Sequence, residues 1–148
     1  MMRHVTPSGD SLYVESAEGR SLELVPLERL GVRAVRGDLA ALSDGSVLLR
    51  QEAEHGSAPL QRCELASGAC QPLAGGLQVG VAFRLAVDEA QGRLRVADTP
   101  HHRLLLADLE GRVLREHSEG CSFPSAETPV EAGAMLVSDQ NRAGLLRV

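Results

Sequence analysis

The chain has 148 residues, of which 43% are hydrophobic, and a formal net charge of −5. This length and apolar content fit one ordinary globular domain and argue against disorder. The basic residues, all arginine, are spread among the acids and only three residues are aromatic, so we expect no nucleic-acid surface. No stretch has the roughly 18 apolar residues that a membrane helix needs, and no signal peptide is evident at the N-terminus.

The chain repeats one pattern four times: an apolar strand, a short turn, a second apolar strand, a polar loop and a further strand. We expect these units to be blades over about residues 1–30, 37–75, 83–117 and 123–148 of a single domain. Their hairpin turns are predicted at Ser8–Gly9–Asp10, Asp44–Gly45, Gln91–Gly92 and Ala132–Gly133.

The spacing of the units is typical of a β-propeller. The second predicted strands align at Leu12, Val47, Leu94 and Met135, and the intervals of 35, 47 and 41 residues average 41. Propeller blades repeat at about this period. Strands such as Leu104–Ala107 are apolar on both faces, which fits sheets covered on both sides. We therefore predict an all-β, propeller-like fold of about four antiparallel blades, with a β-sandwich as the alternative. A helix through Leu105, Leu109 and Val113 is disfavoured by Pro100 and Gly111.

The first unit contains Gly9-Asp10-Ser11-Leu12, the motif that names the GDSL hydrolases. Asp98-Thr99-Pro100-His101 in the third unit matches the Asp-x-x-His motif of the same hydrolases. In those hydrolases the serine leads into a helix, whereas Ser11 is expected to enter a strand. Their oxyanion site also uses a Gly/Asn block, which is missing here because Asn141 is the chain's single asparagine. We therefore interpret the string as a turn.

The second unit contains a polar loop and a cysteine pair. Residues 51–59, with Glu52, Glu54 and His55, are expected to form a solvated connection. Cys63 and Cys70 flank a predicted hairpin and would lie opposite each other, either as a disulfide or as reduced thiols. Their spacing fits no zinc pattern, and Cys121 is expected to be unpaired.

The third unit, residues 84–117, resembles the NHL repeat of β-propellers. The residues that carry the resemblance are Asp88, Val96, Ala97, Asp98, Thr99, His102 and Arg103. Pro100 and His101 depart from the repeat, which usually has Gly and Asn there. The fourth unit follows the pattern loosely, with Val137-Ser138-Asp139 before Gln140-Asn141-Arg142. The resemblance implies that Asp98 and Arg103 brace a blade corner.

The same corner holds the candidate ligand-binding residues Asp98, His101, His102 and Arg103. We expect an extended segment here, in which adjacent histidines point to opposite sides and do not share one ion. Neither catalytic residues nor metal ligands are assigned.

The resemblance implies a ring of about six blades, whereas this chain holds fewer than four. A ring that is not closed leaves apolar blade faces and strand edges exposed, and such surfaces tend to bind other chains. We therefore expect self-association or further blades from a longer polypeptide. A closed four-bladed ring is the alternative.

The expected function is a non-enzymatic binding or scaffold module that presents its loops to a protein or small ligand, without a cofactor. One alternative is a metal-dependent propeller hydrolase or lyase with Asp88, Asp98, Asp139, His101 and His102 as ligands. Another is a structural part of a larger cell-envelope protein. The compartment, cytoplasmic or extracytoplasmic, stays open.

Overall fold

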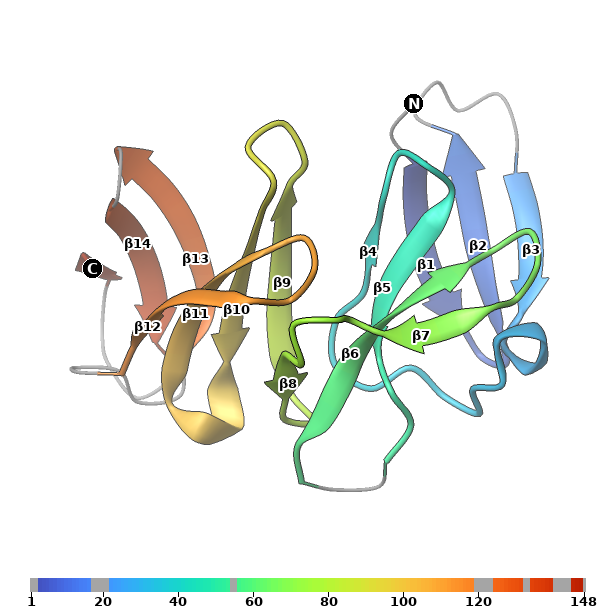
Figure 1. Cartoon of the computed structure of the whole chain (residues 1–148), viewed down its shortest axis with the longest axis horizontal. Helices are drawn as coiled ribbons and strands as arrows, with labels where there is room; N and C mark the ends of the chain where they lie inside the picture. The colour runs from blue at the N-terminus through green and yellow to red at the C-terminus, as the bar shows by residue number, and fades with distance from the viewer. Residues whose placement is uncertain are drawn as a thin grey trace.

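The structure, a computed structural model, describes residues 3–16, 22–53, 56–118, 124–131, 134–139 and 145–147, with side chains for 5–7, 9–15, 23–53 and 56–118. Its strands form antiparallel sheets that follow one another along the chain (Figure 1). The predictions for Glu54, His55, Cys121, Ala132–Gly133 and residues 140–142 lie outside the described part.

The first two sheets occupy the N-terminal half. The first contains β1 (Arg3–Ser8), β2 (Ser11–Ser16) and β3 (Leu22–Pro26), and a short 3₁₀ helix η1 (Leu27–Leu30) follows it. The second contains β4 (Ala40–Ala41), β5 (Ser46–Arg50), β6 (Ala58–Glu64) and β7 (Cys70–Pro72), and β8 (Gln78–Val79) pairs with the start of β6.

The other two sheets complete the fold. The third contains β9 (Phe83–Asp88), β10 (Arg93–Asp98), β11 (Arg103–Asp108) and β12 (Val113–His117), with the 3₁₀ turn η2 (Thr99–His101) between β10 and β11. The fourth contains β13 (Pro124–Glu131), β14 (Ala134–Asp139) and β15 (Leu145–Arg147). No helix in the described residues is long and apolar enough to cross a membrane.

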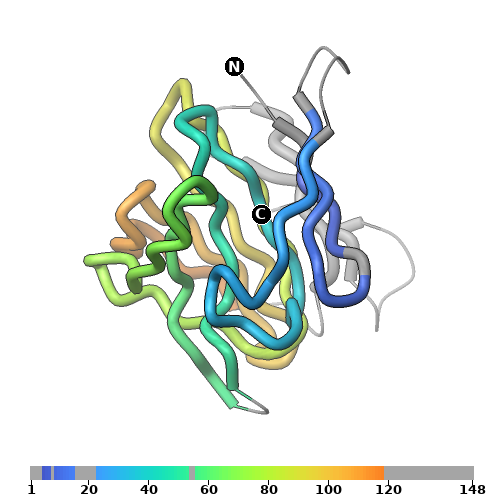
Figure 2. Tube along the Cα trace, turned by 90° about the vertical axis from the view of Figure 1, so that its right-hand side faces the viewer, coloured from blue at the N-terminus to red at the C-terminus, as the bar shows by residue number. Residues whose placement is uncertain are grey.

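The sheets are arranged as in a propeller. The first strand of each sheet contacts the first strand of the next, β1 with β4, β4 with β9 and β9 with β13. In Figure 2, seen from the side of the first sheet, the blue strands of that sheet lie in front of the others. The all-β, propeller-like prediction is confirmed, and the helical alternative through Leu105 is wrong because this residue lies in β11.

The hairpins follow the predicted turns. Gly9, Gly45 and Gly92 each have a positive φ, which glycine adopts without steric cost, and each joins two antiparallel strands. The aligned residues Leu12, Val47, Leu94 and Met135 lie in β2, β5, β10 and β14, the second strands of successive sheets.

The described side chains form two apolar cores, one on each side of the second sheet. All five residues of β5 are buried because its successive side chains point to opposite faces. Val47 and Leu49 pack toward the first sheet, whereas Leu48 packs toward the third. The core toward the first sheet also contains Leu12, Val14, Val25, Leu27, Leu30, Val32, Cys63 and Leu65. The core toward the third contains Leu42, Leu60, Leu73, Leu77, Val79, Phe83, Leu94, Val96, Leu105 and Ala107.

Candidate functional site at the corner of the third sheet

The corner of the third sheet lies where β10 ends and β11 begins. Asp98 and Arg103 are directly opposite each other in the strand register, and η2 connects them. The prediction of an extended segment is wrong here. Pro100 fixes a φ that suits a helical turn, and His102 closes the turn in the left-handed region with φ 52°. The His102 backbone N–H donates to the Thr99 carbonyl, so the two histidines lie in a tight turn.

Asp98 is completely buried, and its carboxylate accepts hydrogen bonds from three groups. The Gly80 backbone N–H lies 3.1 Å from Oδ1. His101 Nδ1 and Arg103 Nε lie 2.8 Å and 2.9 Å from Oδ2. Burying a carboxylate is costly unless it is paired and hydrogen-bonded, and these donors meet that requirement.

Gly80 allows the backbone to approach this carboxylate. A Cβ on residue 80 would lie 2.9 Å from Pro100 Cγ and 3.2 Å from Asp98 Oδ1. A side chain would therefore push the loop before β9 away from the corner. Gly80 was not among the predicted site residues, because its role depends on a segment 18 residues away.

Arg103 extends the bracing in two further directions. Its Nη2 donates to the Gln78 carbonyl at 3.0 Å, and its Nη1 lies 3.8 Å from Glu116 Oε1 on β12. Asp98 is bound through Nε alone, so the ion pair is not bidentate. These contacts connect β8, β10, β11 and β12 at one point, which is a structural bracing role.

His101 links the corner to the loop between β5 and β6. Its ring is 39% exposed, and Nε2 lies 3.2 Å from the Ser57 hydroxyl, on the side of the ring opposite Asp98. Ser57 was not among the predicted site residues, because it is 44 residues from His101 and lies in a loop expected to be a solvated connection.

The loop that carries Ser57 is anchored by a buried arginine. Arg50 is 2% exposed and donates to the carbonyls of Val79, Ala53 and Gly56 at 3.3 Å, 2.9 Å and 2.6 Å. Burial lowers the pKa of Arg50, the neighbouring charge of Arg36 lowers it further, and the Asp98 carboxylate opposes both effects. The signal for this role was present in the sequence, because Arg50 directly follows the apolar run Val47–Leu49.

Of the candidate metal ligands, Asp98 and His101 are in contact, but Asp88 lies far from them. Asp88 pairs in register with Arg93 and Asp98 with Arg103, so the two aspartates lie at opposite ends of β10, roughly 16 Å apart. They cannot bind the same ion. The Asp139 side chain lies outside the described part, and among the described side chains no three His, Cys, Asp or Glu residues form a group that could hold a metal.

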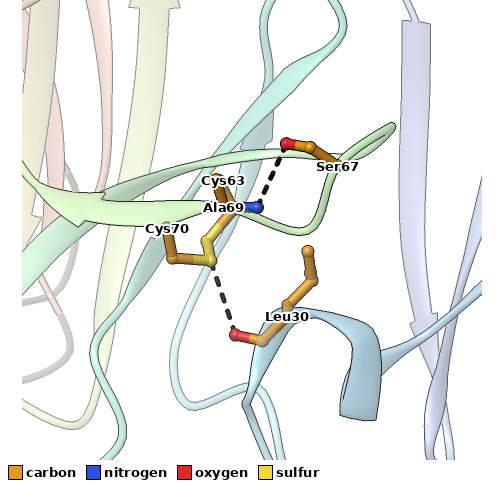
Figure 3. Close-up of a disulfide and its surroundings, with 5 residues drawn as sticks. All are labelled: Leu30, Cys63, Ser67, Ala69 and Cys70. Atoms are coloured by element: carbon orange, nitrogen blue, oxygen red, sulfur yellow. Dashed lines mark hydrogen bonds between the residues drawn. A yellow bond between two sulfur atoms is a disulfide. The ribbon is translucent and has the colours of Figure 1, made fainter.

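Cys63 and Cys70 face each other across β6 and β7 and are joined by a disulfide (Figure 3). Cys63 is fully buried in the core toward the first sheet. The Cys70 sulfur lies 3.5 Å from the Leu30 carbonyl of η1. Because a disulfide sulfur has no hydrogen to donate, this is a packing contact that places the β6–β7 hairpin against η1.

A surface hollow of about 440 Å³ lies beside the second sheet, away from this corner. Asp44 and Arg62 form an ion pair at its wall. The Ser46 hydroxyl, which donates to Asp44 at 2.6 Å, is the largest cause of a lowered pKa for the Asp44 carboxyl, and Arg62 adds to it. Both charged side chains are about half exposed, so this pair contributes little to stability.

Comparisons with known proteins support the fold alone. No family model and no curated protein matches the chain. Among solved structures, it resembles a β-propeller chain in the crystal structure of a nidogen/laminin complex, with a TM-score of 0.59 and 18% identity. The match covers 89% of this chain and 48% of that chain, so this chain spans about half the length of its structural neighbour. The likeness is to propellers in general and does not distinguish the NHL type.

Proposed function

We propose that this chain is a binding and scaffold module of the NHL-propeller type that pairs with a second copy of itself and presents its loops to a protein or small ligand. The outer face of the first sheet carries the proposal. Tyr13 on β2 and Leu24 on β3 are cross-strand neighbours, and they are 41% and 53% exposed. Neighbouring aromatic and aliphatic side chains on a sheet face are typical of surfaces that become buried against a partner.

The second sheet shows what such a face looks like when it is covered. Every residue of β5 is buried because sheets pack against both of its sides. Among the described residues, the first sheet has a neighbouring sheet on one side only, where Leu12, Val14 and Val25 are buried. Its other face therefore lacks the layer that a continuous ring of blades would supply.

A second copy has the right size to be that layer. The chain matches 48% of a propeller chain, so two copies supply nearly the whole length of such a chain. In the proposed ring, the first sheet of each copy packs on the fourth sheet of the other. The NHL assignment is supported by the Asp98–Arg103 brace, which lies where the resemblance implies it.

The mass in solution tests this proposal. We expect analytical ultracentrifugation at micromolar concentrations to give twice the 15.7 kDa chain mass. The double variant Tyr13→Glu/Leu24→Glu should sediment as a monomer with an unchanged circular dichroism spectrum, because charge on this face opposes burial. The matched control is Val113→Glu/Leu114→Glu, whose residues are similarly exposed on β12 of the third sheet and should leave the dimer intact. A monomeric wild type, or dimers in both variants, would exclude pairing through this face.

A further inference from the structure

Ser57, His101 and Asp98 are arranged in hydrogen-bonding order. The Ser57 Oγ lies 3.2 Å from His101 Nε2, and His101 Nδ1 lies 2.8 Å from Asp98 Oδ2. The residues come from two sheets: Ser57 from the loop before β6, and the other two from the corner of the third sheet. We propose that Ser57 is an activated nucleophile that accepts acyl groups from short-chain carboxylic esters, with His101 as its general base.

The buried carboxylate selects the state of the histidine. A carboxylate only accepts hydrogen bonds, so His101 must carry a proton on Nδ1 to bond Asp98. In the neutral ring, Nε2 then has a free lone pair, which faces the Ser57 hydroxyl. This is the arrangement in which a histidine removes the proton of a serine during attack. Asp98 is a positioning residue, since it acts through His101.

Both reacting groups are accessible and held in place. Ser57 is exposed and the His101 ring is 39% exposed, so an ester can reach them from solvent. Arg50 fixes the Gly56 carbonyl immediately before Ser57, and η2 fixes His101 between Pro100 and the left-handed His102. Reacting groups that are already fixed in position lose less entropy when the substrate binds and reacts. Because both groups are exposed to solvent, we expect substrates with a small acyl group and a good leaving group.

The reaction is balanced without any other reactant than water. The Ser57 oxygen forms a bond to the acyl carbon as its proton moves to His101 Nε2. The bond from the acyl carbon to the alcohol oxygen then breaks, and His101 returns the proton to the departing alcohol. Water attacks the acyl-serine in the same manner, which releases the carboxylic acid and restores Ser57.

Arg103 sets the expected rate. It donates to the same Asp98 oxygen as His101, so part of the carboxylate charge is compensated by a neighbouring cation. The guanidinium therefore competes with the imidazole for this oxygen, and Asp98 orients His101 less firmly than an unshared carboxylate would. We therefore expect slow turnover, and covalent labelling is a more sensitive measurement than hydrolysis.

The experiment labels the full chain with a fluorophosphonate probe and maps the adduct by peptide mass spectrometry. We expect the adduct on Ser57, and we expect Ser57→Ala to abolish it. His101→Asn keeps a donor for Asp98 but lacks the base, so the labelling rate should fall about 100-fold. The matched control Ser67→Ala removes an exposed serine from the β6–β7 turn and should label at the wild-type rate.

Asp98→Asn separates positioning from folding. The initial labelling rate should fall because an amide no longer fixes the histidine tautomer, while the final extent of labelling, which counts folded sites, should stay at the wild-type level. No adduct on Ser57, or equal rates in the wild type and His101→Asn, would overturn the proposal. Either result would leave the pairing through the first sheet unaffected, because that rests on a different face.

Discussion

Asp98 and Arg50 are ionisable side chains that lie within the packed interior, and each has fixed polar partners. Asp98 accepts from Gly80, His101 and Arg103, whereas Arg50 donates to three backbone carbonyls. Both lie between the second and third sheets, where an uncompensated charge would be costly. The polar network therefore determines how these two sheets meet at this end of the molecule.

Replacing Asp98 by Asn should lower the free energy of unfolding by about 2–4 kcal/mol, because the Arg103 ion pair and the His101 contact are lost from a buried site. Urea unfolding at pH 7 measures the loss. The control is Asp88→Asn at the other end of the sheet, where the carboxylate accepts from the Gln91 N–H in an exposed turn. This change should cost less than about 1 kcal/mol. Equal losses in the two variants would contradict the bracing role of Asp98.

Asp44 makes a pH-dependent contribution. Its pKa is lowered from 3.8 in the folded chain, mainly by the Ser46 hydroxyl. The ionised carboxylate is therefore more favourable in the folded state than in the unfolded state. The resulting stability is present above the unfolded pKa and is lost as the pH falls through the folded pKa. We expect Asp44→Asn to be less stable than the wild type at pH 7, by under about 1 kcal/mol because the group is exposed.

The difference between the wild type and Asp44→Asn should shrink when both are unfolded in urea at pH 3. A difference that is the same at pH 7 and pH 3 would show that the Asp44 charge makes no contribution.

Among the elements, the β6–β7 hairpin connects the first two sheets. Its Cys63 lies in the core toward the first sheet, and Cys70 contacts η1. A Cβ on Gly68 in the turn would clash with the Arg29 carbonyl oxygen, so the hairpin tip also lies close against η1. The disulfide thus fixes a hairpin that is itself part of the contact between sheets.

Reduction of this disulfide should destabilise the chain by about 2 kcal/mol. The bond links residues seven apart, and closing so short a loop limits the unfolded chain only moderately. Urea unfolding with and without a phosphine reductant measures the change. The double variant Cys63→Ala/Cys70→Ala should have the same urea midpoint with and without the reductant. If the reductant lowered the stability of that variant by the same amount, the loss would not come from the Cys63–Cys70 disulfide.

For the whole molecule, the stacking order of the sheets should determine local stability. Within the described part of the chain, the second and third sheets have a neighbour on each side, whereas the first has one on a single side. Segments with more covered backbone open less often to solvent. The ends of the stack are therefore expected to respond most to a partner.

Hydrogen exchange measured by mass spectrometry tests this order. Amides of β5 and β10 should exchange more slowly than those of β2 and β3 at low protein concentration. As the concentration rises into the range where copies pair, β2 and β3 should become more protected while β5 changes little. Protection of the first sheet that is independent of concentration would argue against pairing through Tyr13 and Leu24.

The strands, hairpin turns and propeller-like repeat were predictable from the sequence because they depend on rules that act over a few residues. Alternation and apolar runs identify strands, glycines such as Gly45 mark turns, and the spacing of Leu12, Val47 and Leu94 gives the period. The Asp98–Arg103 pair was also within reach, since the two residues face each other across one hairpin.

The remainder of the site depends on how one sheet lies on another. Ser57 meets His101 across 44 residues, Gly80 meets Asp98 across 18, and Arg50 reaches Val79 across 29. No local preference encodes such contacts, because they arise when the packing of two apolar faces fixes the relative position of their loops. Local residue preferences thus specify the strands of each blade and their order along the chain. Which serine the corner histidine faces is fixed instead by the packing of the second and third sheets against each other.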